Sequence, residues 1–142
     1  MGKIVLLAGV NPMETGESDY SWHPLSVVAV GTALRAAGHD PVVIDCQVHP
    51  DWTEQLARHV PGALYVGVTC MTGPSISNVL RAIDISRSAA PEVPVVWGGY
   101  HASLAYRGIL REGLADVAVV GPGEIPALRL ARLRHAAYHA VR

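Results

Sequence analysis

The sequence predicts an α/β fold, a three-layer sandwich of helices around a parallel sheet, and two patterns carry that prediction. Short runs of β-branched and aliphatic residues alternate along the chain with longer amphipathic segments, the pattern of parallel strands joined by right-handed crossover helices. These runs are apolar almost throughout, as expected of strands that helices cover on both faces. Five such strands in 142 residues indicate one domain, residues 1–142, of the flavodoxin-like (Rossmann-like) type with strand order 2-1-3-4-5.

The five strands are expected at 3–8, 41–45, 63–69, 95–98 and 116–120. The helices are expected at about 24–37, 51–60, 74–90 and 102–112, and from 125 toward the C-terminus. Pro24 suits the first position of its helix, and Gly38 suits the position just past its end. Asp51 is a candidate N-cap for the second helix. The polar segment 9–22 after the first strand has a length that is usually functional or mobile in compact domains.

Hydrophobic spacing indicates the third and fourth helices. The third carries apolar residues at i, i+3 and i+4 spacing, namely Ile76, Val79, Leu80 and Ile83. We expect Gly73 or Ser75 to cap it. In the fourth helix we expect three residues to face the sheet, Leu104, Ile109 and Leu110. Gly113 then ends this helix.

Composition excludes several classes of protein. The net charge is −1 and only 16% of residues are charged, with no basic stripe, so we expect neither nucleic acid nor a membrane as a partner. The first apolar run is too short for a signal peptide or a membrane span, which predicts a cytoplasmic protein. Cys46 and Cys70 are the only cysteines. They are expected to be reduced thiols and cannot form a three-cysteine iron–sulfur site.

Glycine-bearing segments follow four strands that meet at one edge of the predicted sheet: 9–12, 69–75, 98–101 and 121–124. In open α/β sheets ligands bind at the carboxyl ends of the strands. These segments offer backbone donors with little side-chain bulk, which suits a large flat or elongated ligand. Gly98-Gly99 read alone is equally well explained as a tight turn that binds nothing.

Four familiar ligand motifs are not supported. The first strand ends in Gly9-Val10-Asn11-Pro12 and lacks the G-x-G-x-x-G fingerprint of dinucleotide binding, and no G-x-x-x-x-G-K-[ST] P-loop occurs. Thr15-Gly16-Glu17-Ser18 is only weakly similar to the loop that binds the flavin phosphate in flavodoxins. A phosphoacceptor receiver domain needs acidic residues where Asn11 and Thr69 stand.

The motifs at the strand ends resemble a known family. Thr69-Cys70-Met71 is similar to the S-x-L triplet after strand three of cobalamin-binding domains, and Gly98-Gly99 matches their Gly-Gly pair after strand four. Trp22 to Ser26, Gly98-Gly99-Tyr100-His101 and Gly121-Pro122-Gly123-Glu124 are similar to further motifs of one variety. That variety is N-terminal in cobalamin-dependent radical S-adenosylmethionine enzymes, the class B methyltransferases.

The resemblance implies a cofactor site but no catalytic residue and no protein metal ligand. Thr69, Thr72 and Ser75 would hydrogen-bond the nucleotide tail of cobalamin, as methylcobalamin or hydroxocobalamin. Gly98 and Gly99 would leave room for that tail, and Tyr100, His101 and the 121–124 turn would border the corrin. The full set of expected cofactor-binding residues is Thr69, Cys70, Met71, Thr72, Gly73, Ser75, Gly98, Gly99, Tyr100, His101, Gly121, Pro122, Gly123 and Glu124.

Departures from the family pattern limit what the chain would do alone. Residues 9–22 contain no histidine, so the resemblance implies base-off cobalamin without a histidine lower ligand. Pro122 replaces the usual acid. No C-x-x-x-C-x-x-C occurs, so this chain would bind no iron–sulfur cluster.

The chain is therefore expected to be a cobalamin-binding module, freestanding or a fragment, inactive alone. It would serve methyl transfer with a separate radical S-adenosylmethionine domain or protein. Two alternatives stay open: a cofactor-free interaction or sensor domain of the same fold, and a small flavin or nucleotide binder.

Overall fold

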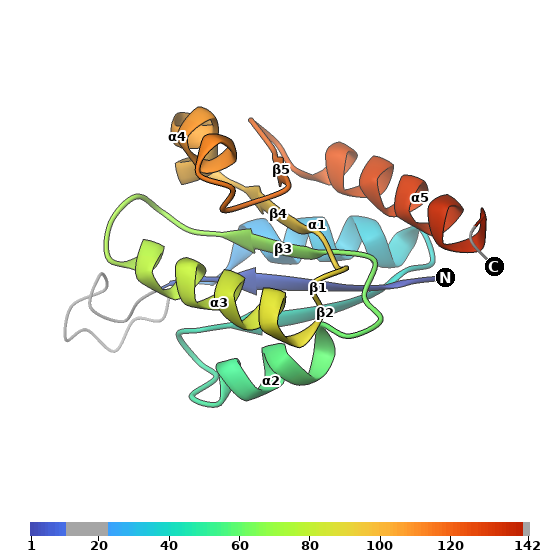
Figure 1. Ribbon diagram of the computed structural model, residues 1–142, viewed down its shortest axis with the longest axis horizontal. Coiled ribbons are helices and arrows are strands. Elements are labelled where there is room, and N and C mark those ends of the chain that lie inside the picture. The colour runs from blue at the N-terminus through green and yellow to red at the C-terminus, as the bar shows by residue number, and fades with distance from the viewer. Residues whose placement is uncertain (11–22, 141–142) are drawn as a thin grey trace.

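The computed structural model describes residues 1–10 and 23–140, and their centre is a five-stranded sheet (Figure 1). The strands are β1 (Lys3–Ala8), β2 (Asp40–Asp45), β3 (Val66–Thr69), β4 (Val95–Gly98) and β5 (Val117–Ala118). Their order is β2-β1-β3-β4-β5, and every neighbouring pair is parallel. The predicted fold class and strand order are confirmed.

Five helices cover the two faces of this sheet: α1 (Leu25–Ala36), α2 (Trp52–His59), α3 (Ser75–Ala89), α4 (Tyr100–Arg111) and α5 (Glu124–Ala140). Buried residues of α1 and α5 pack with one face of the strands. Buried residues of α2, α3 and α4 pack with the other, and Figure 1 shows the two layers. None of the helices in residues 1–10 and 23–140 is long and apolar enough to cross a bilayer.

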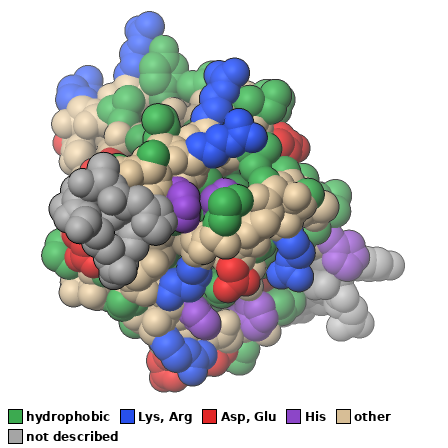
Figure 2. Space-filling view, turned by 90° about the vertical axis from the view of Figure 1, so that its right-hand side faces the viewer, with side chains coloured by type: hydrophobic (Ala, Val, Ile, Leu, Met, Phe, Trp, Pro, Cys, Tyr) green, Lys and Arg blue, Asp and Glu red, His purple; other side chains and the backbone are tan. Residues whose placement is uncertain are grey.

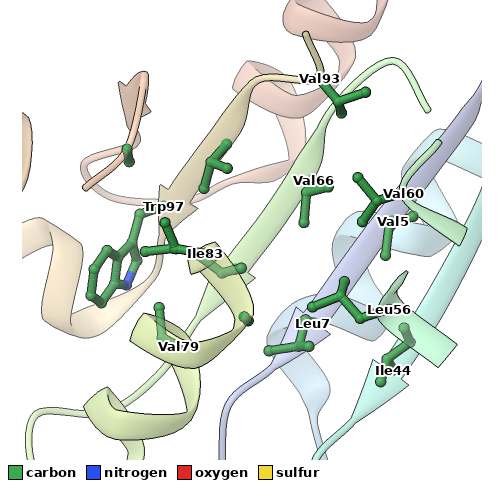
Figure 3. Packing of buried hydrophobic residues seen from close by; sticks show 14 of the residues in the cluster. Val5, Leu7, Ile44, Leu56, Val60, Val66, Val79, Ile83, Val93 and Trp97 are labelled. Atoms are coloured by element: carbon green, nitrogen blue, oxygen red, sulfur yellow. The ribbon is translucent and has the colours of Figure 1, made fainter. Parts of the chain in front are cut away.

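The face covered by α2, α3 and α4 is densely packed. Figure 3 shows Val66 and Trp97 of neighbouring strands pointing toward Val79 and Ile83 of α3. Trp97 is only 1% exposed, and side chains alternate between the faces because successive residues of a strand point in opposite directions. Cys46 and Cys70 are both free and buried. Burial raises the pKa of the Cys46 thiol to about 12, so this thiol stays protonated.

The expected limits of several elements need correction. The third strand begins at Val66 rather than residue 63, although Leu64 N–H still donates to the Lys3 carbonyl. The fifth strand spans only Val117–Ala118. Asp51 precedes α2 but makes no side-chain cap, because its carboxylate accepts a bond from Gln55 instead.

Expectations for the later helices also need correction. The N-cap residue of α3 is Pro74, not Gly73 or Ser75, and no side chain caps this helix. α4 begins at Tyr100, two residues before the expected start. Only Ile109 of the three expected residues is buried, whereas Leu104 and Leu110 are 68% and 44% exposed. Ala102 and Ala105 take their place against the sheet.

Charged side chains of both signs share the protein surface. On the face in Figure 2, Lys and Arg lie among Asp, Glu and His rather than in a single-sign patch. His39 differs from these exposed groups because it is 7% exposed and its Nδ1 accepts the Gly2 N–H at 3.4 Å. Burial lowers the pKa of His39 below 6.5, and the N-terminal ammonium, His135 and Arg132 lower it further.

The lowered pKa of His39 predicts acid sensitivity of the fold. As the pH falls through 6.5, the unfolded chain takes up a proton that the folded chain refuses, so the free energy of unfolding decreases until the folded-state pKa is reached. Denaturant titrations between pH 8 and 5 of His39→Gln should show a smaller decrease than the parent protein. His23→Gln, which changes an exposed histidine, is the control. Equal pH dependence of all three proteins would contradict this role of His39.

Candidate functional site

A cavity of about 230 Å³ opens between the sheet and the helices α1 and α5. Leu6 of β1, Gly67 of β3 and Val96 of β4 form its floor, and Val30 and Ala127 stand on the helices opposite. The cavity lies on the face opposite to the densely packed core of Figure 3. Thr69, Gly98, Gly99 and the 121–124 turn line it at the carboxyl edge of the sheet.

Glycines let neighbouring groups approach closely around this space. Gly67 occupies the middle of β3, and a Cβ there would lie 2.9 Å from Leu6 Cδ2. Gly123 at the start of α5 approaches α1, where a Cβ would lie 3.3 Å from Val30 Cγ2. Neither position could take a larger residue without displacing a neighbour. Glycine inside a strand commonly marks such a close approach or a ligand.

Gly98 and Gly99 serve different purposes. Gly98 has no positive φ, and a Cβ there would make ordinary contact with Val119 at 3.5 Å. Its lack of a side chain therefore leaves cavity space open. Gly99 has φ 91° and ψ −161°, a region nearly exclusive to glycine. A Cβ on Gly99 would overlap Thr69 Oγ1, so Gly99 is required for the turn itself.

Thr69-Cys70-Met71 sends successive side chains in different directions. Thr69 ends β3 opposite Gly98 of β4 and lines the cavity. Cys70 is buried in the core on the opposite face, and Met71 is 56% exposed beyond the strand. Of this triplet, the threonine alone reaches the cavity.

Ser103 ties two of the glycine segments together. Its hydroxyl donates to the Gly99 carbonyl at 2.8 Å and accepts the Gly121 N–H at 3.0 Å. The turn after β4 and the turn before α5 are thus held in register across the mouth of the cavity. Sequence reasoning missed Ser103, because a serine in the first turn of a helix is unremarkable without its partners.

His101 belongs to a separate group on the other side of the strand ends. Its Nδ1 lies 2.9 Å from Thr72 Oγ1, and its ring contacts the Trp97 indole with centroids 5.4 Å apart. The backbone N–H of His101 donates to the Cys70 carbonyl at 3.3 Å. Trp97 Nε1 is buried and has no hydrogen-bond partner among the described residues. The imidazole is therefore held in place but does not line the cavity.

The structure divides the expected site residues into two sets. Those lining the cavity are Thr69, Gly98, Gly99, Gly121, Pro122, Gly123 and Glu124. Those outside its lining are Cys70, Met71, Thr72, Gly73, Ser75, Tyr100 and His101. Tyr100 is 57% exposed, whereas Ser75 is fully buried. Glu124 stands in the first turn of α5, where the helix dipole favours a carboxylate without any ligand.

Sequence reasoning also missed lining residues inside the sheet. Gly67 carries a usable signal, because a glycine inside an apolar strand commonly marks close approach. Tyr65 does not, since a tyrosine before a strand is ordinary. No group of three or more His, Cys, Asp or Glu side chains that could hold a metal ion occurs within residues 1–10 and 23–140.

Comparison with known proteins identifies relatives of this chain. The family model for the B12 binding domain matches residues 15–131. The hopanoid C-3 methylase of Methylococcus capsulatus is 33% identical over 114 residues, covering 75% of this chain and 21% of that protein. The anaerobic magnesium-protoporphyrin IX monomethyl ester cyclase of Rubrivivax gelatinosus is 30% identical, covering 78% of this chain and 20% of the cyclase. The chain thus spans about a fifth of the length of these relatives.

Alanine substitutions should separate the roles of the two adjacent glycines. Gly99→Ala is expected to lower the free energy of unfolding by at least about 2 kcal/mol, because it combines a forbidden backbone conformation with overlap at Thr69. Gly98→Ala should stay within about 1 kcal/mol of the parent protein. Denaturant titration measures both.

Gly62→Ala is the matched control for backbone strain, because Gly62 has φ 76° and open space around it. It should cost roughly 1–2 kcal/mol. A Gly99→Ala cost no greater than that of Gly62→Ala would show that the Thr69 contact relaxes freely.

Proposed function

The chain belongs to the B12-binding domain family, as its motifs indicated, and we propose that its cavity receives the nucleotide tail of a cobalamin. The observation that carries this proposal is the cavity beneath α1 and α5, which Gly67 and Gly98 line without side chains. An elongated group can enter there from the carboxyl edge of the sheet, the edge where α/β folds bind ligands. Cobalamin binding then uses a space that no side chain of residues 1–10 and 23–137 fills.

The residues around the cavity fit such a tail. Thr69 lines it at the end of β3, where its hydroxyl can bond the polar part of the tail. Gly98 gives the tail its room, while Gly99 and Ser103 hold the mouth in shape. Pro122 brings no carboxylate to the adjoining turn, so the backbone and Glu124 remain as polar groups there.

The corrin ring would lie over the outer rim of the strand ends. Tyr100 and Met71 are more than half exposed there, and the bond between Thr72 and His101 fixes a polar group beside them. We assign these four residues to the edge of the corrin and its amide arms. We propose that these four residues bind the cofactor and transfer no proton.

The bound cofactor supplies a methyl group carried on cobalt. This chain's part is to hold the cofactor and exclude solvent from its tail, because it has no C-x-x-x-C-x-x-C motif for an iron–sulfur cluster. We propose that a radical S-adenosylmethionine domain, in a longer chain or in a separate protein, completes the enzyme. The named relatives are about five times as long as the matched region, which leaves ample length for such a domain.

Hydroxocobalamin binding tests the proposal directly. The protein, incubated with hydroxocobalamin and desalted, should keep the corrin absorption spectrum at close to one equivalent. Gly98→Leu should lose it, because the new side chain fills the cavity beside Val119. Gly108→Leu is the matched control, since a Cβ at that helical glycine of α4 meets nothing within 4 Å.

Folding must be checked so that loss of binding is informative. Val30→Trp fills the same space from α1 and should also abolish retention, while circular dichroism shows both variants folded. A parent protein that retains no corrin overturns the proposal and favours the cofactor-free reading. Retained yellow flavin would favour a flavin binder.

The absence of histidine from residues 9–22 predicts the state of the bound cofactor. We propose base-off cobalamin in which no histidine ligates cobalt. The electron paramagnetic resonance spectrum of the bound Co(II) form should then lack axial nitrogen splitting, which free base-on cob(II)alamin provides as the control. Nitrogen splitting that His101→Ala or His23→Ala removes would contradict the proposal.

A further inference from the structure

The inner part of the cavity is apolar. Aliphatic side chains from both the sheet and the two helices line it, among them Leu6, Val27, Val30, Val96, Val119 and Leu130. The polar side chains Ser26, Thr69 and Glu124 also line it, but they stand in the first turn of α1, at the end of β3 and in the first turn of α5. All three of those places belong to the carboxyl edge, so polar groups surround the mouth and hydrocarbon surrounds the interior.

Tyr65 is the polar side chain farthest from that mouth. It is 2% exposed, and its hydroxyl donates to the Ala127 carbonyl of α5 at 3.1 Å. The single hydroxyl proton is therefore committed within the protein, and burial raises the pKa of Tyr65 so that the proton stays. The backbone groups of the floor are engaged in the parallel pairing of β1, β3 and β4.

These walls discriminate between lower bases of the cofactor. Dimethylbenzimidazole, released from cobalt, exposes methyl groups and one ring nitrogen. Adenine in the same place brings further ring acceptors and an exocyclic amino group. Burying polar groups without partners is unfavourable. Among the described residues that line the interior, Tyr65 carries the one side-chain donor, which is engaged with Ala127, whereas the hydroxyls of Ser26 and Thr69 line only the mouth.

We propose that this cavity selects cobamides with an apolar benzimidazole base over those with a purine base. The inference rests on the proposed binding of the nucleotide tail, and it names Val30, Val96 and Val119 as specificity-determining residues. Each presents only methyl groups where a purine would need a hydrogen-bond partner. One unpaired polar group should weaken binding at least about tenfold.

The test compares two corrinoids with the same upper ligand. Dissociation constants of hydroxocobalamin and of the hydroxo form of the adenine-containing cobamide are measured by titrating the quenching of tryptophan fluorescence. In the parent protein, the ratio of the adenine to the benzimidazole dissociation constant also contains the different costs of releasing the two bases from cobalt, so the readout is the change in this ratio on substitution. Val119→Thr, nearly isosteric but carrying a hydroxyl in the cavity, should reduce that ratio.

Val120→Thr is the matched control, because the neighbouring Val120 is 57% exposed and lies outside the lining. It should leave the ratio unchanged. The cost of releasing each base from cobalt is the same in all three proteins, so a change in the ratio reports the cavity alone. A ratio that Val119→Thr does not alter overturns the base preference. Binding of neither corrinoid overturns the proposed function itself.

Discussion

The contact between the Gly99 backbone and the Thr69 side chain is the constraint on which the cavity mouth depends. The chain leaves β4 with φ 91° at Gly99 and enters α4 at once. This turn brings the Gly99 backbone against Thr69. It also places the Gly99 carbonyl where the Ser103 hydroxyl donates a hydrogen bond to it. Ser103 then reaches Gly121. The conformation of one glycine therefore links β3, α4 and the turn before α5.

The two faces of the sheet differ in how densely they are packed. Trp97 and its neighbours fill the face under α2, α3 and α4, and dense packing of this kind fixes a single arrangement of the strands. The opposite face keeps its helices apart from the sheet around Gly67. Long-range hydrogen bonds hold α5 there without filling the space, among them those from Tyr65 to the Ala127 carbonyl and from Arg134 to the Leu64 carbonyl. Dense packing under α2, α3 and α4 keeps the sheet in place although the cavity under α1 and α5 is not filled.

The sequence predicts the architecture well because alternation and apolar runs are properties of whole segments. Strand order and the parallel pairing follow from them. The faces of α4 were harder to predict, because Ala102 and Ala105 carry the buried side while the strongly hydrophobic Leu104 points outward. The Gly98-Gly99 pair indicates a tight turn in the sequence. Only the φ angles show that Gly99 is needed for its backbone conformation, whereas Gly98 is needed for the space it leaves. The link through Ser103 joins segments that are distant in sequence, and no local pattern reveals it.

An apolar hollow is a cost to the domain when nothing fills it. Its lining side chains forgo the contacts that close packing would give them, and apolar cavities hold water poorly. A larger residue at Gly98 would reduce that hollow. The cavity instead keeps about 230 Å³ open. It lies across the sheet from the densely packed face under α2, α3 and α4. An apolar group inserted there regains the lost contacts without moving the sheet. The hollow thus couples occupancy to stability, because any ligand that binds only the folded domain stabilises it.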